Sequence, residues 1–122
     1  MYSAAVLDHF HHPRNAGELE GATVAVEVSN PVCGDVLQLA ARVQDERILA
    51  VRFKAKGCVT ALACGSYLTE MVNGLTTGKA RAITPDAISE ALGSLPPATM
   101  HAAQLACDAL RELLDNLNRQ QA

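Results

Sequence analysis

Aromatic residues are scarce in this sequence of 122 positions, which contains two tyrosines, two phenylalanines and no tryptophan. A core, if one forms, must therefore be built from aliphatic side chains and alanine. The chain also lacks a basic excess, since its formal net charge is −3 at pH 7. Without a positive field to hold a phosphate backbone, we expect no nucleic-acid partner.

Long hydrophobic runs are also missing. No segment approaches the roughly 18 apolar residues that a membrane-spanning helix requires. The N-terminal stretch carries Asp8, Arg14 and several histidines, so it has no apolar signal-peptide core. We therefore expect no membrane association and a cytoplasmic location, where thiols stay reduced. The four cysteines are then better explained by metal binding, sulfur chemistry or core packing than by disulfides.

The composition that remains is typical of a globular protein. Hydrophobic residues make up 49% of the chain and charged residues 19%, a balance that argues against disorder. The length suits one domain with a single core, so we expect residues 1–122 to form one domain.

Hydrophobic periodicity predicts an α+β fold. Helical patterns are expected at residues 3–11 with Ser3 as N-cap, from residue 59 to about Gly74, from Thr84 to Gly93, and across residues 100–117. Apolar residues alternate with polar or small ones in three segments, at residues 24–28, 37–43 and 49–55. The expected architecture is a small antiparallel three-stranded sheet packed against helices.

The second and third strands bring two cysteines together. The polar residues 44–47 form the turn between them, so Val43 should lie opposite Ile48. In an antiparallel pair the numbers of opposed residues add to a constant, and Cys33 with Cys58 gives the same sum as Val43 with Ile48. We therefore expect these two thiols near each other at the open end of the hairpin.

The neighbours of this cysteine pair favour reactive chemistry. Asp35 places a carboxylate two residues after Cys33. Cys58 begins a helix just after Lys54 and Lys56, and helix N-termini and ammonium groups both favour a thiolate. Sulfur and oxygen ligands of this kind suit iron or zinc.

Of the other cysteines and the histidines, only His101 is a candidate for the site. Cys64 and Cys107 fall on the apolar stripes of their helices and are predicted to be core residues. His9, His11 and His12 could form a metal-binding tract, although a surface cluster is the better interpretation. His101 begins the last helix off its apolar stripe and could complete a site with Cys33, Asp35 and Cys58.

Several motifs carry a family resemblance. In order and spacing, the chain resembles the IscU and NifU N-terminal scaffold proteins from about Tyr2 to about Asn118. The segments that match are 2–3, 8–10, 13–17, 30–35, 53–58, 69–76 and 95–101.

The resemblance implies a scaffold for iron–sulfur cluster assembly that is not itself an enzyme. Such a protein receives sulfur from a cysteine desulfurase, binds iron or a labile [2Fe–2S] cluster, and passes the cluster to client apoproteins. Zinc can occupy the same site. Four of the family's five site positions match Cys33, Asp35, Cys58 and His101.

Two motifs depart from the family pattern. The family has a cysteine directly after the histidine, where this chain has Ala102. The family motif read by an Hsp70-type chaperone is Leu-Pro-Pro-Val-Lys, and here the last two positions are Ala98 and Thr99. The resemblance implies an Hsp70-type chaperone as a partner, through a motif that keeps only Leu95-Pro96-Pro97.

Three functional hypotheses follow. The first is the scaffold or carrier, with a homodimer as a further source of ligands. The second is a zinc-bound paralogue that binds or regulates the desulfurase without assembling clusters. The third, a small zinc hydrolase using Asp35, lacks a second carboxylate or general base in a compelling position.

Overall fold

The computed structural model describes residues 2–32 and 34–121. Its sheet contains β1 (Val24–Ser29), β2 (Val36–Gln44) and β3 (Arg47–Lys56). The strands are antiparallel, in the order β1-β2-β3. The prediction of a three-stranded antiparallel sheet with helices is therefore confirmed.

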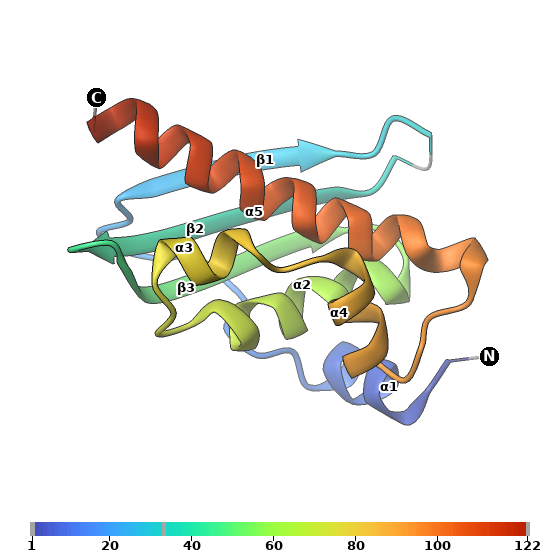
Figure 1. Cartoon of the computed structure of the whole chain (residues 1–122). Coiled ribbons are helices and arrows are strands. Elements are labelled where there is room, and N and C mark those ends of the chain that lie inside the picture. Colours follow the sequence, from blue (N-terminus) through green and yellow to red (C-terminus); the bar gives the residue numbers. More distant parts are fainter. Residues whose placement is uncertain (1, 33, 122) are drawn as a thin grey trace.

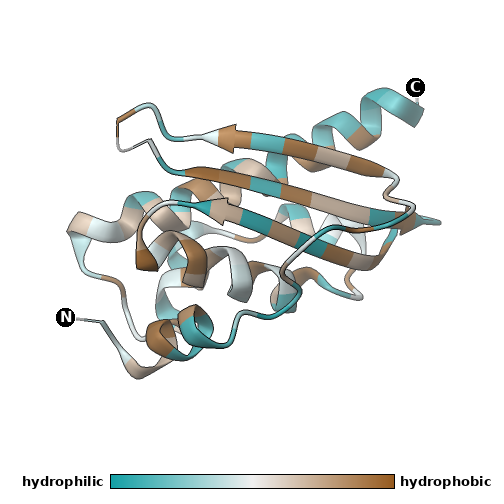
Figure 2. Cartoon of the chain, turned by 180° about the vertical axis from the view of Figure 1, so that it is seen from behind, coloured by the Kyte–Doolittle hydropathy of each residue, from teal (hydrophilic) through white to brown (hydrophobic). Residues whose placement is uncertain are grey.

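The helices lie on one side of this sheet (Figure 1). They are α1 (Ala4–His11), α2 (Val59–Val72), α3 (Thr77–Arg81), α4 (Pro85–Ala91), the 3-10 helix η1 (Pro97–Thr99) and α5 (Met100–Gln121). Figure 2, which views the sheet from behind, shows the other face without a helical layer, with strands that alternate between hydrophobic and hydrophilic colours. None of the helices in the described ranges has the length and apolar character needed to cross a bilayer.

Aliphatic side chains fill the space between sheet and helices, as the scarcity of aromatics requires. Leu37 and Leu39 of β2 belong to the same buried cluster as Leu68 of α2 and Leu114 of α5. Phe53 packs so tightly on α2 that a Cβ at Gly65 would lie 2.8 Å from its ring. A glycine at this position lets the helix approach the strand closely.

Helix caps follow the sequence signals closely. Ser3 caps α1 through the Val6 amide, and Thr84 caps α4 through the Ala87 amide. The short helix α3 was not predicted, because five residues are too few to show a helical period.

A β-bulge in the hairpin of β2 and β3 corrects the predicted register. Val43 does pair with Ile48 as expected, but Arg42 pairs with Ala50, so Leu49 is the extra residue. Leu49 is 51% exposed although its alternation pattern placed it in the core. Beyond the bulge, each residue of β2 pairs with a residue one position later in β3 than the predicted register gives. Val36, for example, lies opposite Lys56. The predicted opposition of Cys33 and Cys58 lies outside the described residues, because Cys33 is not among them.

The two edges of the sheet differ. The edge of β3 is covered, because Phe53 hydrogen-bonds through its backbone to Asn15 and Gly17, and Ile48 bonds to Gly74 and Leu75. For β1, by contrast, the described residues provide no backbone partner on the side away from β2. One edge of the sheet is thus closed by the chain itself and the other is open.

Candidate metal centre

Three of the four predicted site residues converge beyond the open end of the hairpin. One ligand atom each from Asp35, Cys58 and His101 lies within 4.8 Å of the others. The Cys58 Sγ is 3.4 Å from Asp35 Oδ2, and His101 Nε2 is 3.7 Å from the same oxygen. These residues come from the segment before β2, the start of α2 and the first turn of α5, so the tertiary fold creates the cluster.

Asp35 is held in a nearly closed pocket, with 5% of its surface exposed. Its backbone carbonyl accepts a hydrogen bond from the Asn30 amide, which closes the loop before β2. Gly57 lies against its carboxylate, where a Cβ would come within 2.3 Å of Oδ1. Gly57 also has φ of +149°, which favours glycine. Both observations explain why a glycine precedes Cys58.

Cys58 is the N-cap of α2, and its Sγ accepts a hydrogen bond from the Ala61 amide at 3.4 Å. The expectation of a depressed pKa is nevertheless wrong. Burial raises the pKa of the Cys58 thiol, and the nearby Asp35 raises it further, against the opposing effect of the Ala61 amide. Lys54 does not act on the thiol, because it pairs with Glu18 on the open face of the sheet. A cation at the site would therefore be needed to stabilise the thiolate.

His101 is oriented by the loop that precedes it. Its Nδ1 lies 3.2 Å from the Ala98 carbonyl, and because a carbonyl only accepts, Nδ1 must carry the proton. In the neutral ring, Nε2 then turns its lone pair toward Asp35. The loop is fixed by the Leu95 amide, which donates to Ser89 Oγ, and by the Thr99 amide, which donates to the Pro96 carbonyl. A backbone carbonyl that orients the ring in this way is typical of metal-binding histidines.

The donor set has the chemistry of a cation site. The Asp35 carboxylate, the Nε2 lone pair of His101 and the Cys58 sulfur face one another. The thiol proton of Cys58 is the hydrogen that these groups can share. Burial of such acceptors is unfavourable unless a proton or metal lies between them. Sulfur, nitrogen and oxygen donors together suit zinc or iron.

The remaining positions of the predicted site have different outcomes. Cys33 lies outside the described residues. Ala102, which follows His101, is buried with 1% exposure and packs in the hydrophobic core. Position 102 therefore offers a methyl group where the related family has a thiol.

Cys64 and Cys107 are core residues, as predicted. Both are buried, and burial raises the pKa of Cys64 to about 12 and that of Cys107 to about 11. Thiols with such pKa values stay protonated at neutral pH and are poor ligands. Neither belongs to the group formed by Asp35, Cys58 and His101.

His9 has a structural role that the sequence did not reveal. It is buried, its Nδ1 lies 2.8 Å from Ser66 Oγ and its Nε2 lies 3.4 Å from Glu70. Burial lowers the pKa of His9, and Arg14 lowers it further, while Glu70 opposes this shift. These contacts dock α1 onto α2. His11 and His12 are exposed, and no histidine of this group joins a metal-binding cluster in the described part of the chain.

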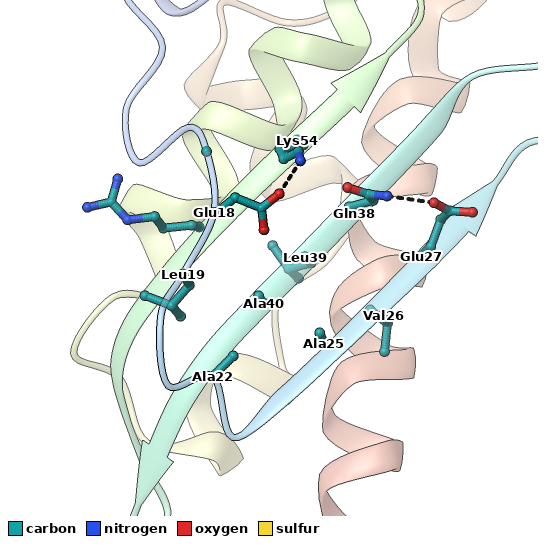
Figure 3. Close-up of a pocket in the computed structure, with 12 residues that line it drawn as sticks. Glu18, Leu19, Ala22, Ala25, Val26, Glu27, Gln38, Leu39, Ala40 and Lys54 are labelled. Carbon is teal, nitrogen blue, oxygen red and sulfur yellow. Dashed lines mark hydrogen bonds and ion pairs between the residues drawn. The ribbon is translucent and has the colours of Figure 1, made fainter.

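A broad hollow of about 500 Å³ lies elsewhere, on the open face of the sheet (Figure 3). Its floor includes Ala25 and Ala40, and its charged side chains pair with neighbours: Lys54 with Glu18, and Glu27 with Gln38 at 2.7 Å. Its described lining contains none of Asp35, Cys58 and His101, so it is separate from the candidate metal centre that they form.

Comparison with known proteins supplies the class. The chain is 47% identical over 114 residues to the iron–sulfur cluster assembly scaffold protein IscU 1 of Archaeoglobus fulgidus, covering 93% of this chain and 74% of that protein. It is 43% identical over 111 residues to the scaffold protein IscU of Aquifex aeolicus, covering 89% and 71%. These relatives are named as scaffold proteins and not as enzymes.

The fold agrees with this class. A crystal structure of a proposed iron–sulfur cluster assembly scaffold for the SUF system of Fervidobacterium islandicum superposes with a TM-score of 0.80 at 22% identity, covering 93% of this chain and 96% of that one. The class is thus an iron–sulfur cluster assembly scaffold of the IscU/NifU type. Because residues 1–122 match the family of the NifU-like N terminal domain, the chain belongs to that family.

Proposed function

We propose that this chain is a scaffold on which iron–sulfur clusters are assembled, with Cys33, Asp35, Cys58 and His101 as the ligands of the cargo. The observation that carries this proposal is the convergence of a carboxylate, a thiol and an imidazole within 4.8 Å. The names of the curated relatives support the same role. In this proposal residues 1–122 act as one scaffold domain in the cytoplasm.

The cargo would be built from iron and sulfur. A cysteine desulfurase would supply the sulfur, and iron or a labile [2Fe–2S] cluster would be held before transfer to client apoproteins. Zinc suits the same donors and would compete for them. An Hsp70-type chaperone is a further proposed partner, which would bind the rigid segment Leu95-Pro96-Pro97 without the usual lysine at position 99.

A second function is favoured by one observation. The side chain at position 102 is a buried methyl group, so the site has two thiols at most, from Cys33 and Cys58. Thiolate ligands suit an iron–sulfur cluster better than a carboxylate does. The alternative is therefore a zinc-bound paralogue that binds or regulates the desulfurase without assembling clusters.

Anaerobic reconstitution distinguishes the two functions. The chain is mixed with ferrous iron, cysteine and a cysteine desulfurase, and visible absorption, iron and acid-labile sulfide are measured. Equal iron and sulfide with visible absorption support the scaffold. A colourless protein that retains zinc supports the paralogue.

Two variants and one control variant sharpen this test. Cys58→Ser removes a proposed ligand and should abolish cluster and zinc uptake, whereas Cys107→Ser leaves both unchanged because Cys107 is a core residue. Ala102→Cys adds the missing thiol. If only Ala102→Cys assembles clusters, the native chain is the regulatory paralogue.

A further inference from the structure

The free edge of β1 is the feature of this molecule that the proposed function does not use. Edge strands of soluble proteins are commonly protected by proline, lysine, a bulge or a covering segment. The β1 segment Val24–Ser29 contains no proline and no lysine, and its pairing with β2 is regular. The opposite edge, at β3, is covered by residues 15–17 and 74–77.

The unpaired backbone groups of β1 can be assigned. Asn30 and Asp35 continue the register that pairs Ser29 with Val36, and the Asn30 amide donates to the Asp35 carbonyl. Asn30 and Asp35 are therefore a hydrogen-bonded pair. Antiparallel strands alternate between hydrogen-bonded and non-hydrogen-bonded pairs, so even-numbered residues of β1 bond to β2. The amides and carbonyls of Ala25, Glu27 and Ser29 then point away from the sheet, and they have no hydrogen-bond partner among the described residues.

The inner side of this edge is apolar and incompletely covered. Val24 is buried, whereas Val26 and Val28 are only half-buried although they face the helical layer. Shallow hollows run along the edge between β1 and α5. A strand added here would pair with the backbone and cover both half-buried valines.

Charges along these hollows are distributed unevenly. Near Glu27 and Val28, the lining of α5 is mostly acidic; near Val24 and Ala25, it carries one cation, Arg119. The acidic end is lined by Asp108, Glu112 and Asp115, together with Arg111. Within the chain these acids form exposed ion pairs, Glu112 with Arg119, Asp115 with Arg81 and Asp108 with Arg111, which a second copy could exchange for pairs across the interface. An antiparallel copy of the same edge would place the cationic end of each chain against the acidic end of the other.

From this geometry we infer that β1 is the dimer interface of this chain, pairing antiparallel with β1 of a second copy about a two-fold axis at Val26. The two sheets then form one six-stranded sheet with both helical layers on the same side. Ala25 of each chain exchanges two hydrogen bonds with Glu27 of the other, which uses the outward backbone groups.

The register is selected by charge. Centring the axis on Val26 places Val24 opposite Val28, so the apolar face is continuous across the interface, and Glu27 lies opposite Ala25. Centring it on Glu27 would oppose two glutamates directly, which destabilises a strand pair. Along α5, the Val26 axis brings Arg119 of one chain toward the region of Asp108 in the other.

This dimer keeps the two metal centres apart. Each metal centre lies beyond Ser29, and Ser29 is three residues from the axis at Val26. At about 3.3 Å per residue, the two Ser29 positions are about 20 Å apart along the strands. The two chains therefore do not share one metal ion or cluster, and dimerisation is independent of metal.

Sedimentation equilibrium on the metal-free chain tests this inference. The mass should rise from 12.9 kDa toward twice that value as the protein concentration increases. Ala25→Pro removes an outward amide without affecting the bonds to β2, and proline is tolerated at such edge positions. It should raise the dimer dissociation constant at least about tenfold. The control, Ala25→Thr, keeps the amide and should dimerise as the native chain does.

A charge exchange gives an independent readout. Arg119→Glu should weaken the dimer, and addition of Asp108→Arg in the same chain should restore it, because each site then meets an opposite charge again. Circular dichroism establishes that each variant is folded, and if Ala25→Pro is not, the charge pair decides. A chain that stays monomeric at every concentration, or a dimer unaffected by both Ala25→Pro and Arg119→Glu, overturns the inference.

Discussion

At the scale of single residues, the candidate metal centre depends on a glycine that contributes no ligand. Gly57 provides the space into which the Asp35 carboxylate fits, 2.3 Å from the position that a Cβ would take. A side chain at this position must displace either the aspartate or the start of α2. The distances that join Asp35, Cys58 and His101 would then all change.

We therefore expect Gly57→Ala to lower the free energy of unfolding by about 1–3 kcal/mol and to weaken zinc binding. The steric contact and the φ of +149° both contribute. Chemical denaturation and zinc titration measure the two effects. Gly78→Ala is the matched control, because Gly78 has open space and lies within α3; it should be neutral or stabilising. A Gly57→Ala chain that binds zinc as tightly as the native chain would contradict this role.

His9 links stability to pH. Its pKa is lowered mainly by burial, so the folded chain holds a proton on this ring less readily than the unfolded chain does. The stabilising contribution is complete above the unfolded pKa of about 6.5. It is lost as the pH falls from there through the folded pKa.

Substitution of His9 by Gln should accordingly reduce the loss of stability between about pH 8 and about pH 5.5. Denaturant unfolding at both pH values measures this difference. His12→Gln serves as the control, because His12 is exposed and should leave the pH dependence unchanged. An equal pH dependence in the native chain and in His9→Gln would show that other groups govern it.

These residues also show what the sequence can predict. The convergence of Asp35, Cys58 and His101 could be anticipated because their chemistry and local context are unusual, and because they match a family; their role as ligands stays a prediction. The burial of His9 depends on Ser66 and Glu70, more than fifty positions away in the chain, and no local pattern predicts such a contact. The pKa direction of Cys58 was missed for the same reason, since burial is a property of the folded chain.

At the scale of elements, the hairpin of β2 and β3 combines a correct prediction with an error. Alternation located both strands, because one face of the sheet is buried and period two follows from that burial. It could not locate the bulge, since Ile48 and Leu49 are both apolar and either could have pointed inward. Only the packing of Ile48 against the core decides between them.

Substitutions at these two neighbours should therefore differ sharply. Leu49→Thr should change the free energy of unfolding by less than about 0.5 kcal/mol, because the side chain is about half exposed. Ile48→Ala should cost about 2–5 kcal/mol, because Ile48 is 1% exposed. Equilibrium unfolding of both variants measures the contrast, and equal costs would place the bulge elsewhere.

At the scale of the whole molecule, we expect stability and the proposed metal binding to oppose each other at Asp35. The carboxylate is buried beside two other acceptors, and among the described residues the hydrogen bond that it accepts comes from the Cys58 thiol. Without a cation, this arrangement reduces the stability of the fold. When a cation is bound, its binding free energy adds to the free energy of unfolding.

Asp35→Asn should consequently stabilise the metal-free chain by about 1 kcal/mol, because an amide can donate to both neighbours. The same change should weaken zinc binding and reduce the rise in melting temperature that zinc produces. Thermal unfolding with a chelator and with added zinc measures both effects. The interpretation is wrong if Asp35→Asn destabilises the metal-free chain.

The bulge at Leu49 has a consequence at the opposite end of the hairpin. With this extra residue, the offset that pairs Val36 with Lys56 brings Gly57 opposite Asp35, whereas a regular ladder would bring Gly57 opposite Gly34. The bulge uses one residue of β3 that has no partner on β2, and the pairs on its far side have the register that brings Gly57 opposite Asp35. Deleting Leu49 would join Ile48 to Ala50 and make the ladder regular, so Val43 would keep Ile48, Arg42 would keep Ala50, and the aspartate would keep its place beside Gly57.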